Sequence, residues 1–458
     1  MSSRTETWIS IAATERPASL RLLASDLVEL AKETRQELRV FVIDNGKTEA
    51  TRRATQDALG AIIDERIPLK VENAATAGGS IARSRRDQRN QVRQELSTST
   101  PPAVIWMLDD DVRLEHQVVE SGSLKRKRLH NHLGFLLEVR AQHPDLEVLL
   151  GEVNGDPPIP AVSTFASRLE DFVSSLRRMR EMLPDAQWKG EFAVPTSSAR
   201  DDYYDFAGGV DGATAPRIWA ARRPGMLVAE ALEEMVSEAC DIPFGIGFSR
   251  PILANASGFR SLRDETIRGG HAAFFSPEAF LAQRYASLIF AGIETRRSDT
   301  IASTLYSRAN PGRLRKSTFA VLHARPRHEH ELPNGEQLAR HLIADTWGAA
   351  LTREIDDEAR TNQPFLEGRL SMIDRTLNRI ALAIDEARQL AVTVPQWAKH
   401  PKVPWARLDE SMRWMLDTVP GVREGRLAAP WREILSNIEA AEALRSFARR
   451  LRADHEEE

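Results

Sequence analysis

The first 113 residues alternate between short apolar runs and longer segments of helical character. Four runs have the length and apolar content of buried strands: 8–13, 39–43, 69–71 and 103–108. Three intervening segments have the pattern or the length of helices: 19–34, 49–59 and 80–96. Strands and helices that alternate in this way predict an α/β fold, with a doubly wound, mixed but mainly parallel sheet flanked by helices.

The pattern weakens after residue 113 and becomes regular again near residue 251. Three helices and one loop rich in glycine and aromatic residues are predicted in this stretch: 129–142, 163–183, 225–239 and the loop 201–212. We interpret 114–250 as an insertion or helical subdomain that covers the open edge of the sheet. The sheet domain is then expected to continue with a strand, two helices and a last strand: 269–275, 277–290, the segment after Asp299, and 317–323.

A helical region is predicted for 331–458. Apolar residues recur there at spacings of three and four: Leu370, Ile373, Leu377, Ile380 and Ile384. Such a stripe is typical of a helix packed against its neighbours in a core, and a self-association surface between copies of the chain is the alternative. The sequence thus predicts four regions: 1–113, 114–250, 251–330 and 331–458.

Charge and cysteine content narrow the classes of function. Lys plus Arg number 62 against 66 for Asp plus Glu, a net charge of −4, so we expect no nucleic-acid partner. The basic run 125–128 is interpreted as a solvated edge in a loop. The only cysteine, Cys240, allows no internal disulfide and is read as a core thiol. No apolar run reaches the ~18 residues that a membrane span needs, so a cytoplasmic protein is expected.

Polar residues follow two of the predicted strands directly. The strand 103–108 is followed directly by Asp109, Asp110 and Asp111, and the strand 39–43 by Asp44 and Asn45. Ligands of open α/β sheets bind at the carboxyl ends of the strands. Adjacent carboxylates repel unless a cation compensates, and Mn²⁺ or Mg²⁺ prefers such oxygen ligands. The alternative is a capping turn, in which one Asp accepts from backbone amides and the others face water.

Other residues at the same edge could contact a nucleotide. Thr14 and Arg16 follow the first strand, and Gly79 and Arg83 lie where the helix 80–96 begins. A helix N-terminus offers backbone N–H groups to a diphosphate, and Arg83 could reach the same group.

In order and spacing, these motifs resemble the nucleotide-binding half of family 2 glycosyltransferases of the GT-A fold. That family carries a T-x-R turn, a V-x-D-[DN]-G turn, a G-x-x-x-A-R helix start and a D-x-D motif after the fourth strand. The corresponding residues here are Thr14 to Arg16, Val42 to Gly46, Gly79 to Arg83, and Asp109 to Asp111. The resemblance covers about 7–325, with a gap over 114–250.

The resemblance implies an inverting, metal-dependent glycosyltransferase that uses a nucleoside diphosphate sugar. It places Thr14, Arg16, Asp44, Asn45, Gly79, Arg83, Asp109 and Asp110 around the donor. Asp111 and His323 would hold Mn²⁺ or Mg²⁺, and Gly270 and His271 would lie on the side of an acceptor that is not identified. Region 1–113 would be the donor-binding half of the GT-A domain and 251–330 the acceptor-side half.

The resemblance also assigns a general base, Asp299, which follows Ser298 where the family usually has glutamate. The pair Asp264 and Glu265 is a rival for that role. Two other functions stay open. A nucleotidyltransferase would use a related sheet but usually has a glycine-rich loop after its first strand, which 12–17 lacks. In a non-catalytic scaffold, the C-terminal helices would bind a protein and the sheet domain would be a relic. The same helices could also join copies of the chain into a homo-oligomer.

Overall fold

The computed structural model describes residues 6–34, 37–76, 79–120, 123–128, 132–157, 162–190, 216–253, 262–264, 272–324, 332–356 and 362–456. Their central feature is a nine-stranded sheet with the order β3-β2-β1-β4-β10-β8-β13-β5, in which β9 also pairs with β13. The strands of this sheet are β1 (Glu6–Ala13), β2 (Glu37–Asp44), β3 (Leu69–Asn73), β4 (Val104–Asp109), β5 (Val112–Arg113), β8 (Val148–Gly155), β9 (Leu262–Arg263), β10 (Ala272–Phe275) and β13 (Leu314–His323). The predicted α/β fold class is confirmed.

Strand directions bring most carboxyl ends to one edge of the sheet. β1 pairs in parallel with β2 and β4, β2 with β3, and β8 with β13. β10 is antiparallel to both β4 and β8, so these two neighbours run in the same direction. The ends of β1, β2, β4, β8 and β13 therefore face the same side, where a doubly wound sheet binds its ligands.

Helices cover both faces of this sheet. Buried residues of α1 (Pro17–Glu33), α3 (Gly60–Asp64) and α5 (His132–Gln142) pack on one face. The other face packs against α4 (Ile81–Leu96), α9 (Pro277–Ala282) and α10 (Ser298–Ala309). A short helix α2 (Glu49–Ala58) precedes α3 and contacts α1. Strands covered on both faces need apolar residues at successive positions, and Ile9 and Trp8 of β1 are both fully buried.

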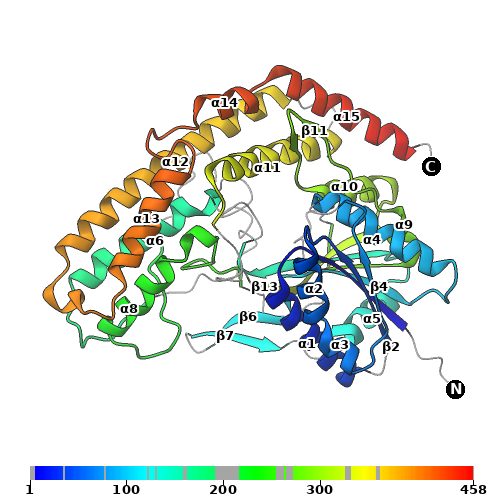
Figure 1. The fold of residues 1–458 in the computed structure, drawn as a ribbon, viewed down its shortest axis with the longest axis horizontal. Coiled ribbons are helices and arrows are strands. Elements are labelled where there is room, and N and C mark those ends of the chain that lie inside the picture. The colour runs from blue at the N-terminus through cyan, green and yellow to red at the C-terminus, as the bar shows by residue number, and fades with distance from the viewer. Residues whose placement is uncertain are drawn as a thin grey trace.

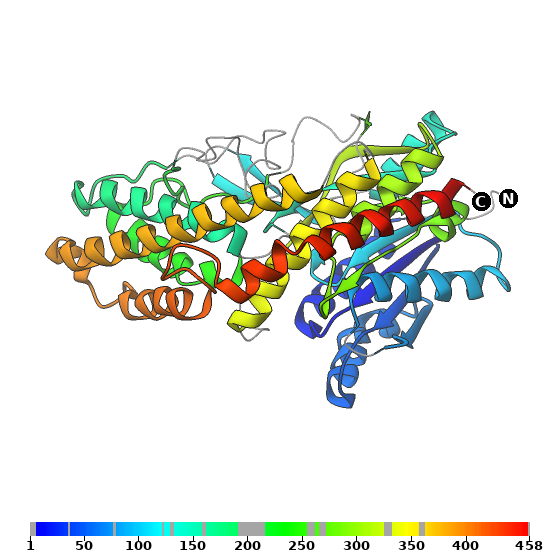
Figure 2. The same cartoon turned by 90° about the horizontal axis from the view of Figure 1, so that it is seen from above.

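A helical region lies beside the sheet domain (Figure 1). Its elements are α6 (Val162–Arg180), α8 (Val228–Ala239), η1 (Ile242–Phe244), α11 (Gly335–Asp356), α12 (Asn362–Thr393), η2 (Gln396–Lys399), α13 (Trp405–Thr418), α14 (Ala429–Leu435) and α15 (Ile438–Glu456). α12 packs along α6, and α15 runs back from this region to contact α10 (Figures 1 and 2). Leu377, Ile380 and Ile384 are completely buried in one apolar cluster with residues of α6. The interpretation of this stripe as core is confirmed.

Three predictions of local structure were wrong. The region 114–250 contributes β8 to the middle of the sheet, so it is more than an insertion. The basic run lies in a strand, β7 (Ser123–Arg128), which pairs with β6 (Glu115–Glu120) and places Lys127 in an ion pair with Glu120. The helix predicted at 277–290 ends at Ala282, and a hairpin of β11 (Ile289–Phe290) and β12 (Ile293–Glu294) follows.

α9 ends early because the backbone of Gln283, directly after it, is extended, with φ of −64° and ψ of 125°. The hairpin then turns at Ala291 and Gly292, which have φ values of 48° and 71°. The boundaries of the four regions remain predictions. Within the described residues, no helix is long and apolar enough to cross a membrane.

Candidate active site

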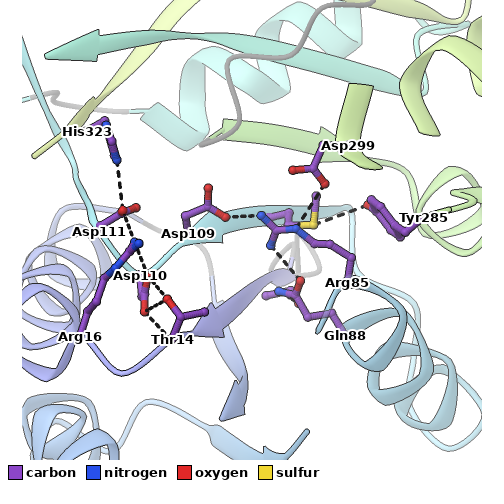
Figure 3. A network of polar contacts seen from close by, with 12 residues as sticks. Thr14, Arg16, Arg85, Gln88, Asp109, Asp110, Asp111, Tyr285, Asp299 and His323 are labelled. Atoms are coloured by element: carbon purple, nitrogen blue, oxygen red, sulfur yellow. Dashed lines mark hydrogen bonds and ion pairs between the residues drawn. The ribbon is translucent and has the colours of Figure 1, made fainter. Parts of the chain in front are cut away.

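Residues from five separate elements meet at the carboxyl edge of the sheet (Figure 3). The loops after β1 and β4 lie side by side because these strands pair in parallel with Ala12 opposite Asp109. Asp110 is only 1% exposed, and Thr14 donates to it from its backbone N–H and, at 3.0 Å, from its hydroxyl. Burial raises the pKa of Asp110 to about 7, and Arg16 acts in the opposite direction. Asp110 thus holds the turn after β1, as in the capping alternative.

Asp111 faces His323, the last residue of β13. Nε2 of His323 lies 3.1 Å from Oδ2 of Asp111, and both side chains are almost completely buried. Nδ1 of His323 lies 2.7 Å from the carbonyl oxygen of Asp156. A carbonyl can only accept, so Nδ1 carries a proton, and in a neutral ring Nε2 then presents its lone pair to Asp111.

Gly155 fixes the backbone beside this histidine. It ends β8 with φ of 89°, and a Cβ at this position would lie 2.4 Å from the carbonyl oxygen of His323. The next residue, Asp156, donates its N–H to that same carbonyl at 2.9 Å. Only glycine combines this conformation with this close approach. Sequence reasoning missed Gly155 and Asp156 because β8 itself was not predicted.

Arg16 supplies positive charge to the aspartate cluster. Its guanidinium contacts Asp110 at 3.3 Å and forms a second ion pair with Asp111. The preceding Glu15 has φ of 59°, and its carboxylate accepts from the N–H of Lys47 at 3.0 Å. This left-handed residue turns the chain so that Thr14 and Arg16 both face the carboxylates.

Asp109 and Asp299 are joined by an arginine that sequence reasoning missed. Arg85, from α4, forms an ion pair with Asp109, and its Nε lies 3.4 Å from Asp299 at the start of α10 (Figure 3). Arg85 is 1% exposed; burial alone lowers its pKa, but the carboxylates of Asp109 and Asp299 outweigh burial and raise it. Nothing in the sequence pointed to it, because the inward face of α4 that Arg85 shares with Ala82 and Gln88 is mostly polar.

Two arginines, Arg296 and Arg297, precede Asp299 in sequence, and the side chain of Arg297 turns toward α11. Arg297 forms a two-fold ion pair with Asp345 of α11, with N–O distances of 2.8 and 3.1 Å. Arg296 donates its backbone N–H to the carbonyl of Ala344. Its pKa is lowered by burial, and nearby Arg297 and Arg16 act in the same direction. The rival base Asp264 is largely exposed and pairs with Arg315. Glu265, Gly270 and His271 lie outside the described residues.

The predicted donor-side residues form a second cluster beside the first. Asn45 and Gly79 exchange two hydrogen bonds, of 2.8 and 3.0 Å, which join the end of β2 to the start of α4. Asp44 is 1% exposed and accepts from the N–H of Gly46 at 2.8 Å; burial raises its pKa. Arg83 lies in the first turn of α4, where its N–H is 3.4 Å from the capping hydroxyl of Ser80.

A divalent cation fits the pair formed by Asp111 and His323. Metal-bound histidines usually donate their second ring N–H to a carbonyl or carboxylate, as Nδ1 does here to Asp156. A carboxylate oxygen and an imidazole nitrogen that face each other at 3.1 Å are suitable ligands for one ion. Among the described residues, no group of three or more His, Cys, Asp or Glu side chains is arranged to hold a metal alone. Phosphate oxygens and water would have to complete the coordination.

Comparisons with known proteins give likenesses of structure. No family model matches the chain, and no curated protein matches it in sequence. Among solved structures, the chain is similar to TarS 1-349 from S. aureus, with a TM-score of 0.35 and 11% identity over 99% of this chain and 91% of that one. It is also similar to the mannosyltransferase PcManGT from Pyrobaculum calidifontis in complex with GDP-Man and Mn²⁺, with a TM-score of 0.34 and 11% identity over 98% of this chain and 88% of that one. The UDP complex of TarS 1-349 gives a TM-score of 0.33 and 10% identity, covering 92% of each chain.

Proposed function

We propose that this protein transfers a sugar from a nucleoside diphosphate sugar to an acceptor hydroxyl, with inversion at the anomeric carbon. The observation that carries the proposal is the meeting of Asp109, Asp111, Asp299 and His323 at the carboxyl edge of one sheet, together with Arg85. These residues come from widely separated parts of the sequence. The site combines a cation-binding pair, a buried arginine and a carboxylate that could act as a base.

The donor nucleotide would lie across the ends of β1, β2 and β4. Asp44 is placed to accept from a base N–H or a ribose hydroxyl, and Asp109 from the ribose. The capped start of α4 presents backbone N–H groups toward a diphosphate. Arg16 and Arg83 would add positive charge to the same group.

Asp111 and His323 would hold a divalent cation against the diphosphate. A bound Mn²⁺ or Mg²⁺ acts as a Lewis acid that stabilises negative charge on the leaving diphosphate. Arg16 pairs with Asp111 here. With a cation at Asp111, the guanidinium of Arg16 would turn toward the phosphate oxygens and add its positive charge there.

Asp299 would be the general base. It accepts the proton of the acceptor hydroxyl while that oxygen forms its bond to the anomeric carbon, and the bond from this carbon to the diphosphate oxygen breaks. One base on the acceptor side is sufficient, and no covalent intermediate is required. Nε of Arg85 lies 3.4 Å from Asp299 and would help to hold its carboxylate in place.

Ligand binding and product analysis test this proposal together. Thermal unfolding with UDP, GDP, dTDP or CDP, each with and without Mn²⁺, should show a rise in Tm for one nucleotide that depends on Mn²⁺. The matching nucleotide sugar should then yield free nucleoside diphosphate and sugar. Release of pyrophosphate instead would identify a nucleotidyltransferase. An absence of both binding and turnover would favour a scaffold.

A further inference from the structure

The helix α11 packs its backbone directly against the loop that leads into Asp299. The N–H of Arg296 donates to the carbonyl of Ala344 at 3.0 Å, and Arg340 donates to the carbonyl of Gly292 at 3.0 Å. One turn beyond Ala344, a Cβ on Gly348 would lie 2.3 Å from the carbonyl oxygen of Arg296. Arg340, Ala344 and Gly348 are four residues apart and share one face of α11. Glycine is therefore required at the closest point.

The same loop contains a residue in a costly backbone conformation. Arg297 caps the N-terminus of α10 with φ of 67°, in the left-handed region. A non-glycine residue in this sparsely populated region is strained and persists only where its surroundings stabilise it. Asp345 stabilises this conformation, because its carboxylate accepts from both Nε and Nη2 of Arg297. Burial acts to raise the pKa of Asp345, but the guanidinium of Arg297 outweighs it and the pKa is lowered.

The conformation of Arg297 determines where α10 begins. Its carbonyl accepts the N–H of Ile301 at 2.9 Å, a hydrogen bond of the first helical turn. Asp299 lies in that turn, so a change of backbone direction at Arg297 displaces the carboxylate that faces Arg85. The loop is also tied to the donor side, since the hydroxyl of Ser80 donates to Glu294 at 2.6 Å.

We propose that α11 positions the general base, through the ion pair from Asp345 to Arg297 and the close contact of Gly348 with Arg296. Asp345 is thus a positioning residue that acts through Asp299. The C-terminal helical region is on this view a part of the catalytic unit. The inference rests on the proposed function and on Asp299 as its base.

The test is a double-mutant cycle on nucleoside diphosphate release from UDP-glucose or GDP-mannose. Asp345→Asn should lower kcat by about 10- to 100-fold while leaving the Mn²⁺-dependent Tm shift with UDP or GDP unchanged. In a chain that already carries Asp299→Asn, the same change should cost almost nothing further, because the group it positions is gone. Glu170→Gln is the matched control, since it breaks a two-fold ion pair with Arg379 between α6 and α12. Its kcat should stay at the level of the unchanged chain.

The possible outcomes distinguish failure of the positioning role of Asp345 from failure of the proposed function. Loss of turnover in Asp299→Asn but full turnover in Asp345→Asn, or additive losses in the double variant, would refute the positioning role alone. If Asp345→Asn does not fold, Arg297→Lys replaces it, because lysine keeps the charge but loses the two-fold contact. If the unchanged chain releases no nucleoside diphosphate, the proposed function fails. Hydrogen exchange at the amide of Ile301 then decides the positioning role: it should be faster in Asp345→Asn than in Glu170→Gln, and equal rates would overturn it.

Discussion

Nε2 of His323 lies 3.1 Å from Oδ2 of Asp111, although 212 residues separate the two in sequence. The carbonyl of Asp156 fixes the proton on the other ring nitrogen, so two electron-rich atoms face each other unless a proton or a cation lies between them. The contact exists because β13 and β4 both end at the same edge of the sheet. A pair of this kind makes the metal assignment directly testable.

Asp111→Asn keeps the shape of the side chain and removes its charge. We expect the Mn²⁺-dependent part of nucleoside diphosphate binding to weaken at least tenfold, since one anionic ligand is lost. Isothermal titration with and without Mn²⁺ measures the effect. Asp26→Asn is the control, because Asp26 is also buried and ion-paired, with Arg113, but lies outside the cluster. Equal binding of Mn²⁺ and nucleotide by Asp111→Asn and the unchanged chain would contradict the assignment.

Gly155→Ala should disturb His323 through its backbone. The new Cβ meets the carbonyl oxygen of His323 at 2.4 Å, and alanine also resists φ of 89°. A destabilisation of about 1–3 kcal/mol is expected, with weaker metal-dependent binding. Gly60→Ala is the matched substitution, because nothing lies within 4 Å of its Cβ. Urea unfolding of both variants compares them, and similar free energies of unfolding would show that Gly155 carries no constraint.

Asp299→Asn should remove the general base and leave the donor site intact. General-base catalysis contributes ~10²–10⁴ in rate, so kcat should fall by about that factor while nucleotide affinity stays the same. Initial rates at saturating donor measure kcat. Asp264→Asn serves as comparison, because Asp264 is exposed and pairs with Arg315. A loss of only a few-fold in Asp299→Asn would move the base elsewhere, with Asp264 and Glu265 the next residues to test.

Asp44→Asn should change the dependence of stability on pH. Burial raises the pKa of Asp44 above its ordinary value of 3.8, so folding favours the protonated carboxyl and its contribution to stability is lost as the pH rises through the folded pKa. Asparagine keeps the oxygen that accepts from Gly46 and carries no charge. The variant should therefore be at least as stable as the unchanged chain at pH 7, and its advantage should shrink as the pH falls toward 3.8. Thermal unfolding of both chains between these pH values tests the prediction. A difference in Tm that is the same at every pH would contradict it.

Leu377→Ala tests the packing of the C-terminal region. Leu377 is fully buried on the face of α12 that packs against α6, so truncation leaves a cavity and should cost about 2–5 kcal/mol. Leu382 lies on the same helix but is 61% exposed, so Leu382→Ala should cost less than about 0.5 kcal/mol. Chemical unfolding of both variants gives the comparison. Equal costs, or dissociation of an oligomer by Leu377→Ala without loss of stability, would favour the self-association alternative.

The sequence contains enough local signal to predict the donor half of the sheet. The strand segments Val40 to Ile43 and Val104 to Leu108 are apolar and buried because both of their faces are covered, and a turn or a charged cluster follows each. β8 could not be predicted in the same way. Its segment includes Glu152 and Asn154, and its pairing partners β10 and β13 lie more than 100 residues further along the chain.

Site residues that belong to a sequence motif were predictable. Residues that only tertiary packing brings into the site were not. His323 was identified through the resemblance to GT-A glycosyltransferases, as the residue that ends the apolar strand before it. Arg85 looks like one of several arginines on a polar helix, and only the fold shows that it is buried between two carboxylates. The ion pair of Arg297 with Asp345 was not predicted, since nothing in the sequence placed these two residues side by side.

The position of β8 also affects how the chain is made. β8 pairs with β10 (Ala272–Phe275) and with β13 (Leu314–His323). Both partners come after it in the sequence. During synthesis from the N-terminus, β8 therefore emerges from the ribosome well before either neighbour, with Leu149 and Leu150 lacking the strands that bury them. Unpaired apolar strands of this kind are prone to aggregate, and pairings between distant segments form slowly. The middle of the sheet therefore closes only after β13 has been synthesised, late in the production of the chain.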